Sequence, residues 1–151
     1  MVLFETPNRG KTMLHLEHIN LVVKDIPKML AFYQAAFPHW SIRDQGVGTW
    51  YGKSRRWLHF GNDYQYIAFS DNGEGENRDL SGHQVGLAHF AYVTHEIEAL
   101  TARLINSGFP VSNDGSNEPF RRNVYFIDPE GFEVEFVQYF SDDPELRNLS
   151  S

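Results

Sequence analysis

Two similar segments, each opened by a histidine, lie nearly half a chain length apart. The first runs from His18 to Asp25 and reads HINLVVKD, and the second runs from His89 to Glu96 and reads HFAYVTHE. Each places a histidine at the start of an apolar, strand-like run and an acidic residue where a helix begins. A repeat of this kind predicts two copies of one structural module, each with a sheet face that the other helps to complete.

The same order of elements follows both histidines. Alternation of apolar residues predicts strands, and recurrence every three to four residues predicts one helix in each half. Asp25 is a candidate helix cap, Pro38 ends the first helix, and Gly108 followed by Pro110 ends the second. The first half is predicted as a strand at 14–23, a helix at 26–36 and strands near 39–45, 55–61 and 64–70; the second half is predicted as a strand at 86–93, a helix at 96–107 and strands near 110–112, 122–127 and 132–140.

A chain of 151 residues normally forms one compact domain with a substantial core. The polar, glycine-bearing stretch between the two halves is typical of a linker, and we expect substrate-shaping loops near 46–54 and 113–121. The expected division is an N-terminal arm at 1–13, a first module at 14–70, a linker at 71–85, a second module at 86–140 and a C-terminal tail at 141–151.

Charge and cysteine content restrict the function classes. The net charge of −7 argues against nucleic acid or an anionic membrane as the main partner. The absence of cysteine excludes disulfides and a thiol nucleophile. No apolar run approaches the roughly 20 residues that span a bilayer, and the first residues do not resemble a signal peptide. We therefore expect a cytoplasmic protein that acts on a small molecule.

A carboxylate joins the two histidines as a candidate metal ligand. Glu135 lies on the last predicted strand, after a turn formed by residues 128–131. Two neutral imidazoles and one carboxylate can hold Fe, Mn, Zn or Ni as a divalent ion and leave positions open for substrate. Glu133 shares the strand face of Glu135, as a neighbouring partner, an alternative ligand or a solvated carboxylate. Alternation places His15 and Glu17 on the strand face opposite His18.

Two longer motifs resemble the vicinal oxygen chelate superfamily, which includes glyoxalase I, extradiol dioxygenases and bleomycin-resistance proteins. The opening motif is LEHINLVVKD at residues 16–25, followed by Phe32 and Tyr33, and the closing motif is DPEGFEVEF at residues 128–136. The resemblance covers residues 14 to about 140. It implies an α+β fold of two tandem βαβββ modules that form a cup-shaped mixed sheet with helices outside. It also implies a divalent metal ion and a homodimer.

The resemblance also implies the ligands. His18, His89 and Glu135 match the metal ligands of the superfamily. Some members have a fourth ligand near the end of the first module, and the alignment places Ile67 there. A shift of two residues would place Gln65 there instead, as a fourth ligand or a substrate contact. Relatives build the cup within one chain or across a dimer, and the sequence leaves both arrangements open.

Aromatic and basic side chains are candidates for a substrate pocket. Three aromatic residues fall on the middle strands of the first module: Trp50, Trp57 and Tyr66. They could line a pocket, or they could pack in the core and at a dimer contact. Arg122 could bind an anionic group or lie on a solvated edge strand.

The function predicted first is a divalent-metal-dependent enzyme that acts on a small oxygenated substrate through a metal-stabilised oxyanion, with Glu135 as a catalytic candidate. Lyase, isomerase and dioxygenase reactions all stay open. The alternative is a non-catalytic dimer that binds a small molecule, like the bleomycin-resistance proteins, for which the acidic charge would favour a cationic drug.

Overall fold

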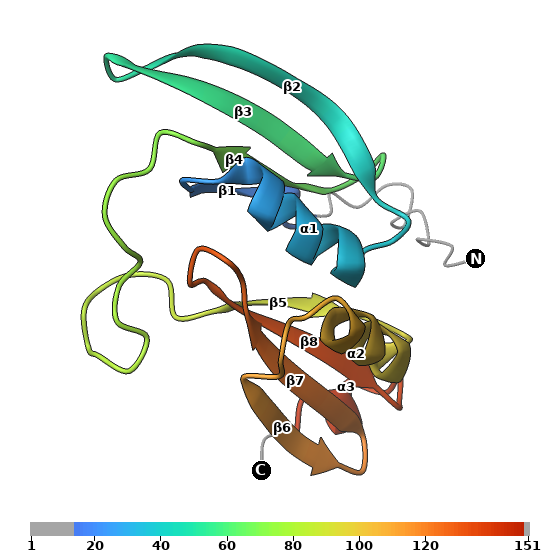
Figure 1. The fold of residues 1–151 in the computed structure, drawn as a ribbon. Coiled ribbons are helices and arrows are strands. Elements are labelled where there is room, and N and C mark those ends of the chain that lie inside the picture. The colour runs from blue at the N-terminus through green and yellow to red at the C-terminus, as the bar shows by residue number, and fades with distance from the viewer. Residues whose placement is uncertain (1–13, 150–151) are drawn as a thin grey trace.

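The chain folds into two four-stranded mixed sheets of identical topology. The computed structural model describes residues 14–149, without the side chains of residues 116 and 117, so the arm expected at 1–13 lies outside the described residues. The elements are β1 (His18–Val22), α1 (Ile26–Ala36), β2 (Ser41–Trp50), β3 (Lys53–Gly61), β4 (Tyr66–Ser70), β5 (Phe90–Val93), α2 (Ile97–Asn106), β6 (Asn113–Glu118), β7 (Arg121–Ile127), β8 (Glu133–Tyr139) and α3 (Pro144–Arg147). Figure 1 shows the two sheets one above the other, with the α1 helix between them.

Strand order confirms the α+β fold of two tandem βαβββ modules. The sheets run β1-β4-β3-β2 and β5-β8-β7-β6. In each sheet the first strand pairs parallel to the last strand of its module, and the other pairs are antiparallel. The two sheets stay separate, and the strands β1 and β5 each occupy an edge.

The strands β1 and β5 begin four residues later than predicted, and two other strands differ more. The β2 strand continues to Trp50, well beyond the predicted end, and β6 begins after the predicted 110–112 segment. Gly46 is therefore inside a strand, where it opposes Trp57; a Cβ atom at this position would lie 2.7 Å from the indole ring. The reversal comes at Tyr51 and Gly52, both of which have positive φ angles. The short α3 helix was not predicted.

The helix boundaries follow from their caps. The Asp25 side chain accepts a hydrogen bond from the Lys28 amide at 3.0 Å, which confirms it as the N-cap of α1. The α2 helix has no side-chain bond from its own N-cap, Glu96; instead Gln138 of β8 accepts from the Ile97 amide at 3.0 Å. Gly108 follows α2 with φ +92°, the left-handed conformation expected after a helix.

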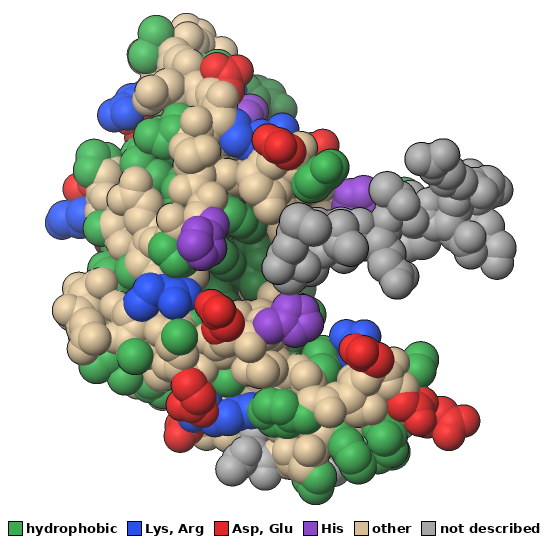
Figure 2. All heavy atoms as spheres, turned by 90° about the vertical axis from the view of Figure 1, so that its right-hand side faces the viewer, with side chains coloured by type: hydrophobic (Ala, Val, Ile, Leu, Met, Phe, Trp, Pro, Cys, Tyr) green, Lys and Arg blue, Asp and Glu red, His purple; other side chains and the backbone are tan. Residues whose placement is uncertain are grey.

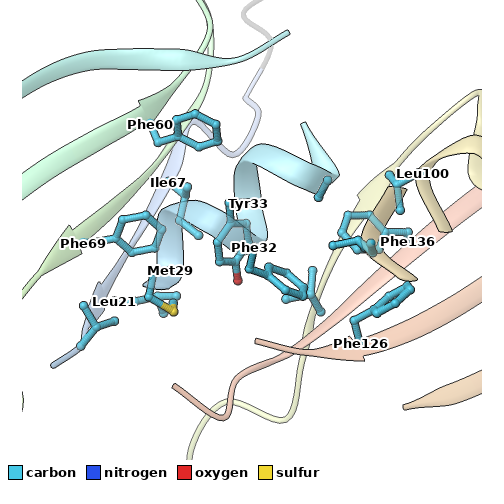
Figure 3. Close-up of a cluster of buried hydrophobic side chains, with 14 of the residues drawn as sticks. Leu21, Met29, Phe32, Tyr33, Phe60, Ile67, Phe69, Leu100, Phe126 and Phe136 are labelled. Carbon is cyan, nitrogen blue, oxygen red and sulfur yellow. The ribbon is translucent and has the colours of Figure 1, made fainter. Parts of the chain in front are cut away.

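One hydrophobic core joins the two modules through the first helix. Met29, Phe32 and Tyr33 of α1 are fully buried. Figure 3 shows this helix between apolar side chains of the first sheet and Phe126 and Phe136 of the second. Each sheet therefore turns one face toward the shared core and the other face away from it.

A buried polar contact reinforces this junction. The Tyr33 hydroxyl donates to Asp128 Oδ2 at 2.8 Å across the two modules. The other oxygen of Asp128 accepts from the amides of Glu130 and Phe132, each at 3.0 Å, which closes the predicted turn before β8. Glu130 in turn accepts from the Lys24 amide at 3.0 Å. The turn thus stabilises both the hairpin of the second module and its attachment to the first.

Asp128 should make stability depend on pH. Burial, opposed by its hydrogen bonds, raises the pKa of Asp128 from 3.8 to about 6. The folded state therefore binds this proton more tightly than the unfolded state, and the free energy of unfolding falls as pH rises from about 4 to about 6, by at most about 3 kcal/mol. Denaturant unfolding of Asp128→Asn, compared with the wild type between pH 4 and 7, should lack this decrease. The exposed Asp63→Asn is the control. If the difference in the free energy of unfolding between the wild type and Asp128→Asn were constant with pH, it would contradict this role of Asp128.

Candidate metal centre

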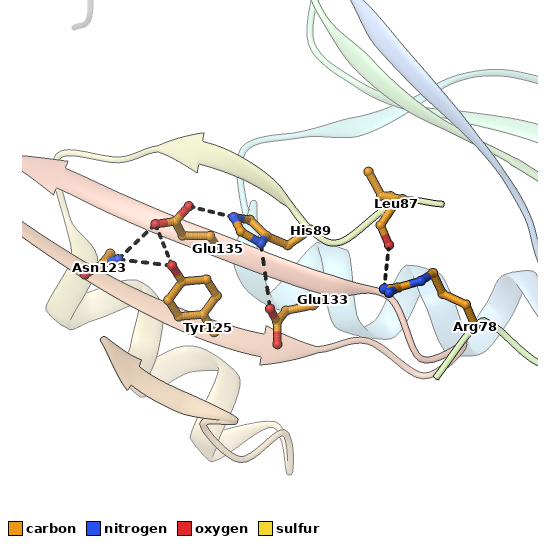
Figure 4. Close-up of polar contacts among 7 residues, drawn as sticks. All are labelled: Arg78, Leu87, His89, Asn123, Tyr125, Glu133 and Glu135. Carbon is orange, nitrogen blue, oxygen red and sulfur yellow. Dashed lines mark hydrogen bonds and ion pairs between the residues drawn. The ribbon is translucent and has the colours of Figure 1, made fainter. Parts of the chain in front are cut away.

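The second module brings together one histidine and two glutamates on the face of its sheet that turns away from the core. His89 immediately precedes β5, and Glu133 and Glu135 alternate on the neighbouring β8 strand. His89 Nε2 lies 3.5 Å from Glu135 Oε2, and its Nδ1 lies 3.9 Å from Glu133 Oε1. Figure 4 shows the imidazole between the two carboxylates.

Two side chains of β7 hold the Glu135 carboxylate in place. Asn123 Nδ2 donates to Glu135 Oε1 at 2.9 Å, and the Tyr125 hydroxyl donates to the same oxygen at 3.2 Å. Burial, followed by the charge of Glu135, raises the pKa of Tyr125, so the hydroxyl keeps its proton and acts as a donor. The sequence analysis missed both roles, although alternation on the predicted 122–127 strand places these residues on one face.

The first module supplies one histidine with a similar environment. His18 opens β1, and its Nδ1 lies 2.8 Å from Glu17 Oε1. Its ring stacks on Tyr66 at 4.5 Å, and Tyr66 stacks on His59 at the same distance. Glu17 was expected to face away from His18. It precedes the strand, where strict alternation no longer applies, and its side chain reaches the imidazole. His15, an exposed residue before β1, has no such contact among the described residues.

Both histidines therefore have Nδ1 directed toward a carboxylate, Glu17 for His18 and Glu133 for His89. The 3.9 Å between His89 Nδ1 and Glu133 Oε1 is too long for a hydrogen bond, whereas for His18 the 2.8 Å contact is a hydrogen bond, and a bond from Nδ1–H to Glu17 fixes the tautomer and leaves Nε2 with its lone pair. This arrangement is common for histidines that bind metal ions, because the carboxylate orients the ring and makes it more basic. In the second module that Nε2 atom already faces Glu135.

The chain does not bring its two half-sites together. Within residues 14–149, no three His, Asp or Glu side chains are grouped so that they could hold a metal ion. His18 is on the first sheet, and His89 and Glu135 are on the second. Both sheets turn their other faces toward the shared core, which separates the face with His18 from the face with His89 and Glu135.

The register of the strands identifies the position that a fourth ligand would take. In the second module Glu135 pairs with Ala91, two residues after His89. In the first module the residue two after His18 is Asn20, which pairs with Ala68. An alanine methyl thus occupies the place equivalent to Glu135.

The residues considered for that fourth position lie elsewhere. Ile67 is fully buried in the core. Gln65 is half-buried and lies just before β4, outside the paired part of the strand. The predicted alignment was one residue short of Ala68, a shift that moves the side chain to the other face of the sheet.

The predicted pocket residues divide between two places. Trp57 lines a cavity of about 360 Å³ on the open face of the first sheet, with Asn20, Arg55, His59, Ala68, Phe69 and Ser70. Tyr66 stacks on His59 beside it, and Trp50 packs against Arg55. Burial is the main cause that lowers the pKa of His59.

Arg122 does not belong to this cavity. It alternates with Asn123 on β7, so it lies on the opposite face from Glu135. Its guanidinium reaches Glu98 of α2 at 2.8 Å and Asp114 of β6 at 3.4 Å. These ion pairs give Arg122 a structural partner on each side.

The family model of the Glyoxalase/Bleomycin resistance protein/Dioxygenase superfamily matches residues 15–136. The chain belongs to this superfamily. A search of curated proteins finds no match. Among the described residues, no helix is long and apolar enough to cross a membrane.

Solved structures of the same fold cover nearly all of the described chain. A glyoxylase/bleomycin resistance protein/dioxygenase domain from Frankia sp. EAN1pec superposes with a TM-score of 0.68 at 19% identity, covering 85% of this chain and 99% of that one. The fosfomycin resistance protein FosX from Listeria monocytogenes gives 0.65 at 21% identity, covering 90% and 99%. A FosX variant complexed with Mn(II) and 1S,2S-dihydroxypropylphosphonic acid gives 0.62 at 23% identity, covering 91% and 100%. At these identities the likeness shows the fold.

Proposed function

We propose that the protein is a divalent-metal-dependent enzyme that acts on a small oxygenated substrate, with His18, His89 and Glu135 as the metal ligands. The observation that carries the proposal is the pair of donors formed by His89 Nε2 and Glu135 Oε2, 3.5 Å apart. Two ligands of one first-row metal ion, each at about 2.0–2.2 Å from it, lie roughly 3 Å apart. The pair therefore needs only a small adjustment to share an ion.

The surroundings of the pair also fit a metal site. Asn123 and Tyr125 hold one oxygen of Glu135 and leave the other directed at His89. Neutral imidazole and carboxylate are donors that Fe, Mn, Zn and Ni accept. When bound, such an ion supplies Lewis-acid stabilisation of a substrate oxyanion. The chain would hold the ligands in place. Because it supplies only three of them, coordination positions of the ion would stay open for substrate.

A second copy of the chain would complete the site. His18 and His89 hold equivalent places in the two modules: His18 opens β1, His89 immediately precedes β5, and both strands lie at a sheet edge. Apposition of the first sheet of one copy and the second sheet of another would bring the histidines together. Val22 and Val93, the exposed apolar residues of these edge strands, support such a contact. The proposed enzyme is thus a homodimer with two sites, each built by both chains.

Metal content tests the proposal. Protein purified without added metal and then titrated with Mn(II), Fe(II), Zn(II) or Ni(II) should bind one of them stoichiometrically. His18→Ala should weaken binding more than about 100-fold, beyond the 10–100-fold typical of residues that only support a ligand. His15→Ala, a nearby exposed histidine, should leave binding unchanged.

Two results would contradict the proposal. Equal losses in His18→Ala and His15→Ala would show that His18 is not a ligand. A wild-type protein with no affinity for any of the four metals would leave the non-catalytic binding dimer as the better description.

A further inference from the structure

Arg55 is a fixed cation on the open face of the first sheet. Its Nη1 donates to Ser70 Oγ at 2.9 Å, and its Cζ lies 4.7 Å from the centre of the Trp50 ring. Ser70 is fully buried, and its hydroxyl also reaches Asn20 Oδ1 at 3.4 Å. The guanidinium is therefore held by a buried hydroxyl on one side and an indole face on the other, both of them neutral.

Among the described residues, no carboxylate pairs with this cation. Within residues 14–149, Arg55 forms no ion pair, and its Nε is buried without an acceptor. A half-buried charge without a partner is costly, and a ligand carboxylate would supply the missing counter-charge. Figure 2 shows acidic and basic side chains interspersed over one face of the molecule, so the net charge of −7 does not exclude local attraction of an anion.

Aromatic rings continue from Arg55 toward His18. Trp57 lies 5.0 Å from His59, His59 lies 4.5 Å from Tyr66, and Tyr66 stacks on His18. The cavity of about 360 Å³ is lined by Arg55 and by the first two rings of this row, Trp57 and His59, and is within the size range of small-molecule sites. Ser70, which holds Arg55, is four residues along β4 from Tyr66, or about 13 Å at the usual strand rise. A planar molecule about 10 Å long could thus lie along the rings, with one end at Arg55 and the other near His18.

We propose that the substrate is a planar, conjugated or aromatic carboxylate whose carboxylate binds Arg55 and whose oxygenated end points toward His18. This inference rests on the proposed function for the role of His18. The contact with Arg55 does not depend on it, because Arg55, Ser70, Trp57 and His59 all belong to one sheet of one chain. A guanidinium binds a carboxylate through two parallel hydrogen bonds, which also orients the molecule.

The test uses 4-hydroxycinnamate, which carries a carboxylate and a phenol at opposite ends, and its neutral amide. Isothermal titration should give binding of the acid to the metal-loaded protein, with the amide at least about tenfold weaker, as expected when a charged hydrogen bond is lost. Arg55→Gln should weaken binding of the acid by a similar factor and leave the affinity for the amide unchanged. Arg55→Lys keeps the positive charge but cannot form two parallel hydrogen bonds, so its affinity for the acid should lie between those of the wild type and Arg55→Gln. Binding by this variant would show that the fold tolerates substitution at position 55.

The neighbouring Arg56→Gln is the matched control. Arg56 is exposed and donates to Gln45 at 3.1 Å, so the same change there should leave both affinities unchanged. The Glu135→Gln variant should still bind the acid more tightly than the amide, whether or not it has lost the metal. Adding Arg55→Gln to this variant should remove that difference. Equal binding of acid and amide, or equal losses in Arg55→Gln and Arg56→Gln, would overturn the inference. Tighter binding of phenylphosphonate than of 4-hydroxycinnamate would overturn the choice of a carboxylate.

Discussion

Heterodimers with His18→Ala in one chain and Glu135→Ala in the other are expected to bind about one metal ion, although neither homodimer binds any tightly. In a site built by both chains, one of the two sites of this heterodimer receives both substitutions, and the other receives intact His18, His89 and Glu135. The structure motivates the experiment because the single chain keeps these residues on separate sheets. Two different affinity tags isolate the heterodimer, and metal analysis gives the result.

The reciprocal heterodimer makes the test decisive. One chain carries both His18→Ala and Glu135→Ala, and the other is wild type. A shared site then loses one ligand on each side, so no tight metal binding is expected. A site within one chain would give the opposite pattern, with one ion in this heterodimer and none in the first. Metal in the reciprocal species alone would therefore show that the ligands of each site come from one chain.

The repeat made most of the fold predictable from the sequence. The histidine runs, the Asp25 cap and the turn ending at Gly131 are local signals, and the structure has each where it was expected. The βαβββ order follows from them because each module reuses the same pattern. The limits of β2 and β6 were missed because residues 46–54 and 113–121 were predicted as loops, whereas β2 continues to Trp50 and β6 spans Asn113–Glu118. Gly46 is required by the Trp57 ring on the neighbouring strand, a contact that no local pattern reveals.

The candidate site was less predictable because it depends on register and on long-range partners. A shift of one residue on β4 separates Ile67, which packs in the core, from Ala68, which faces the cavity. The side chains that hold Glu135 belong to β7, a different strand, and the sequence does not give the register in which β7 pairs with β8. For Arg122 the sequence left an anion-binding role and a solvated edge strand open, whereas the structure places it on an inner strand with an ion pair to α2. Arg55, in contrast, has no ion pair within residues 14–149 and contacts Ser70 and Trp50 instead.

The fold explains why the residues of the proposed metal site lie on two separate sheets. The α1 helix fills the space between the sheets, and the Tyr33–Asp128 contact ties it to the turn that begins β8. Each half-site therefore rests on a strand whose other face is packed in the common core. Such a scaffold can present pre-positioned ligands to a second copy without a large rearrangement.

Phe32→Ala is expected to lower the free energy of unfolding by about 3–5 kcal/mol, the cost typical of removing a fully buried phenylalanine. Phe32 has no exposed surface, and its ring lies 5.1 Å from Phe109 and 6.4 Å from Phe126 of the second module. Because the cavity opens at the junction, both modules should lose stability together. Denaturant unfolding followed by circular dichroism should still show one transition, at lower denaturant concentration.

Phe140→Ala provides the control for this change. That phenylalanine is 54% exposed beyond the end of β8, so its loss should change stability by less than about 1 kcal/mol. A second transition in Phe32→Ala, with one module unfolding before the other, would show that the modules are stable separately. The single core argues against it, since the apolar face of α1 is buried by both sheets at once.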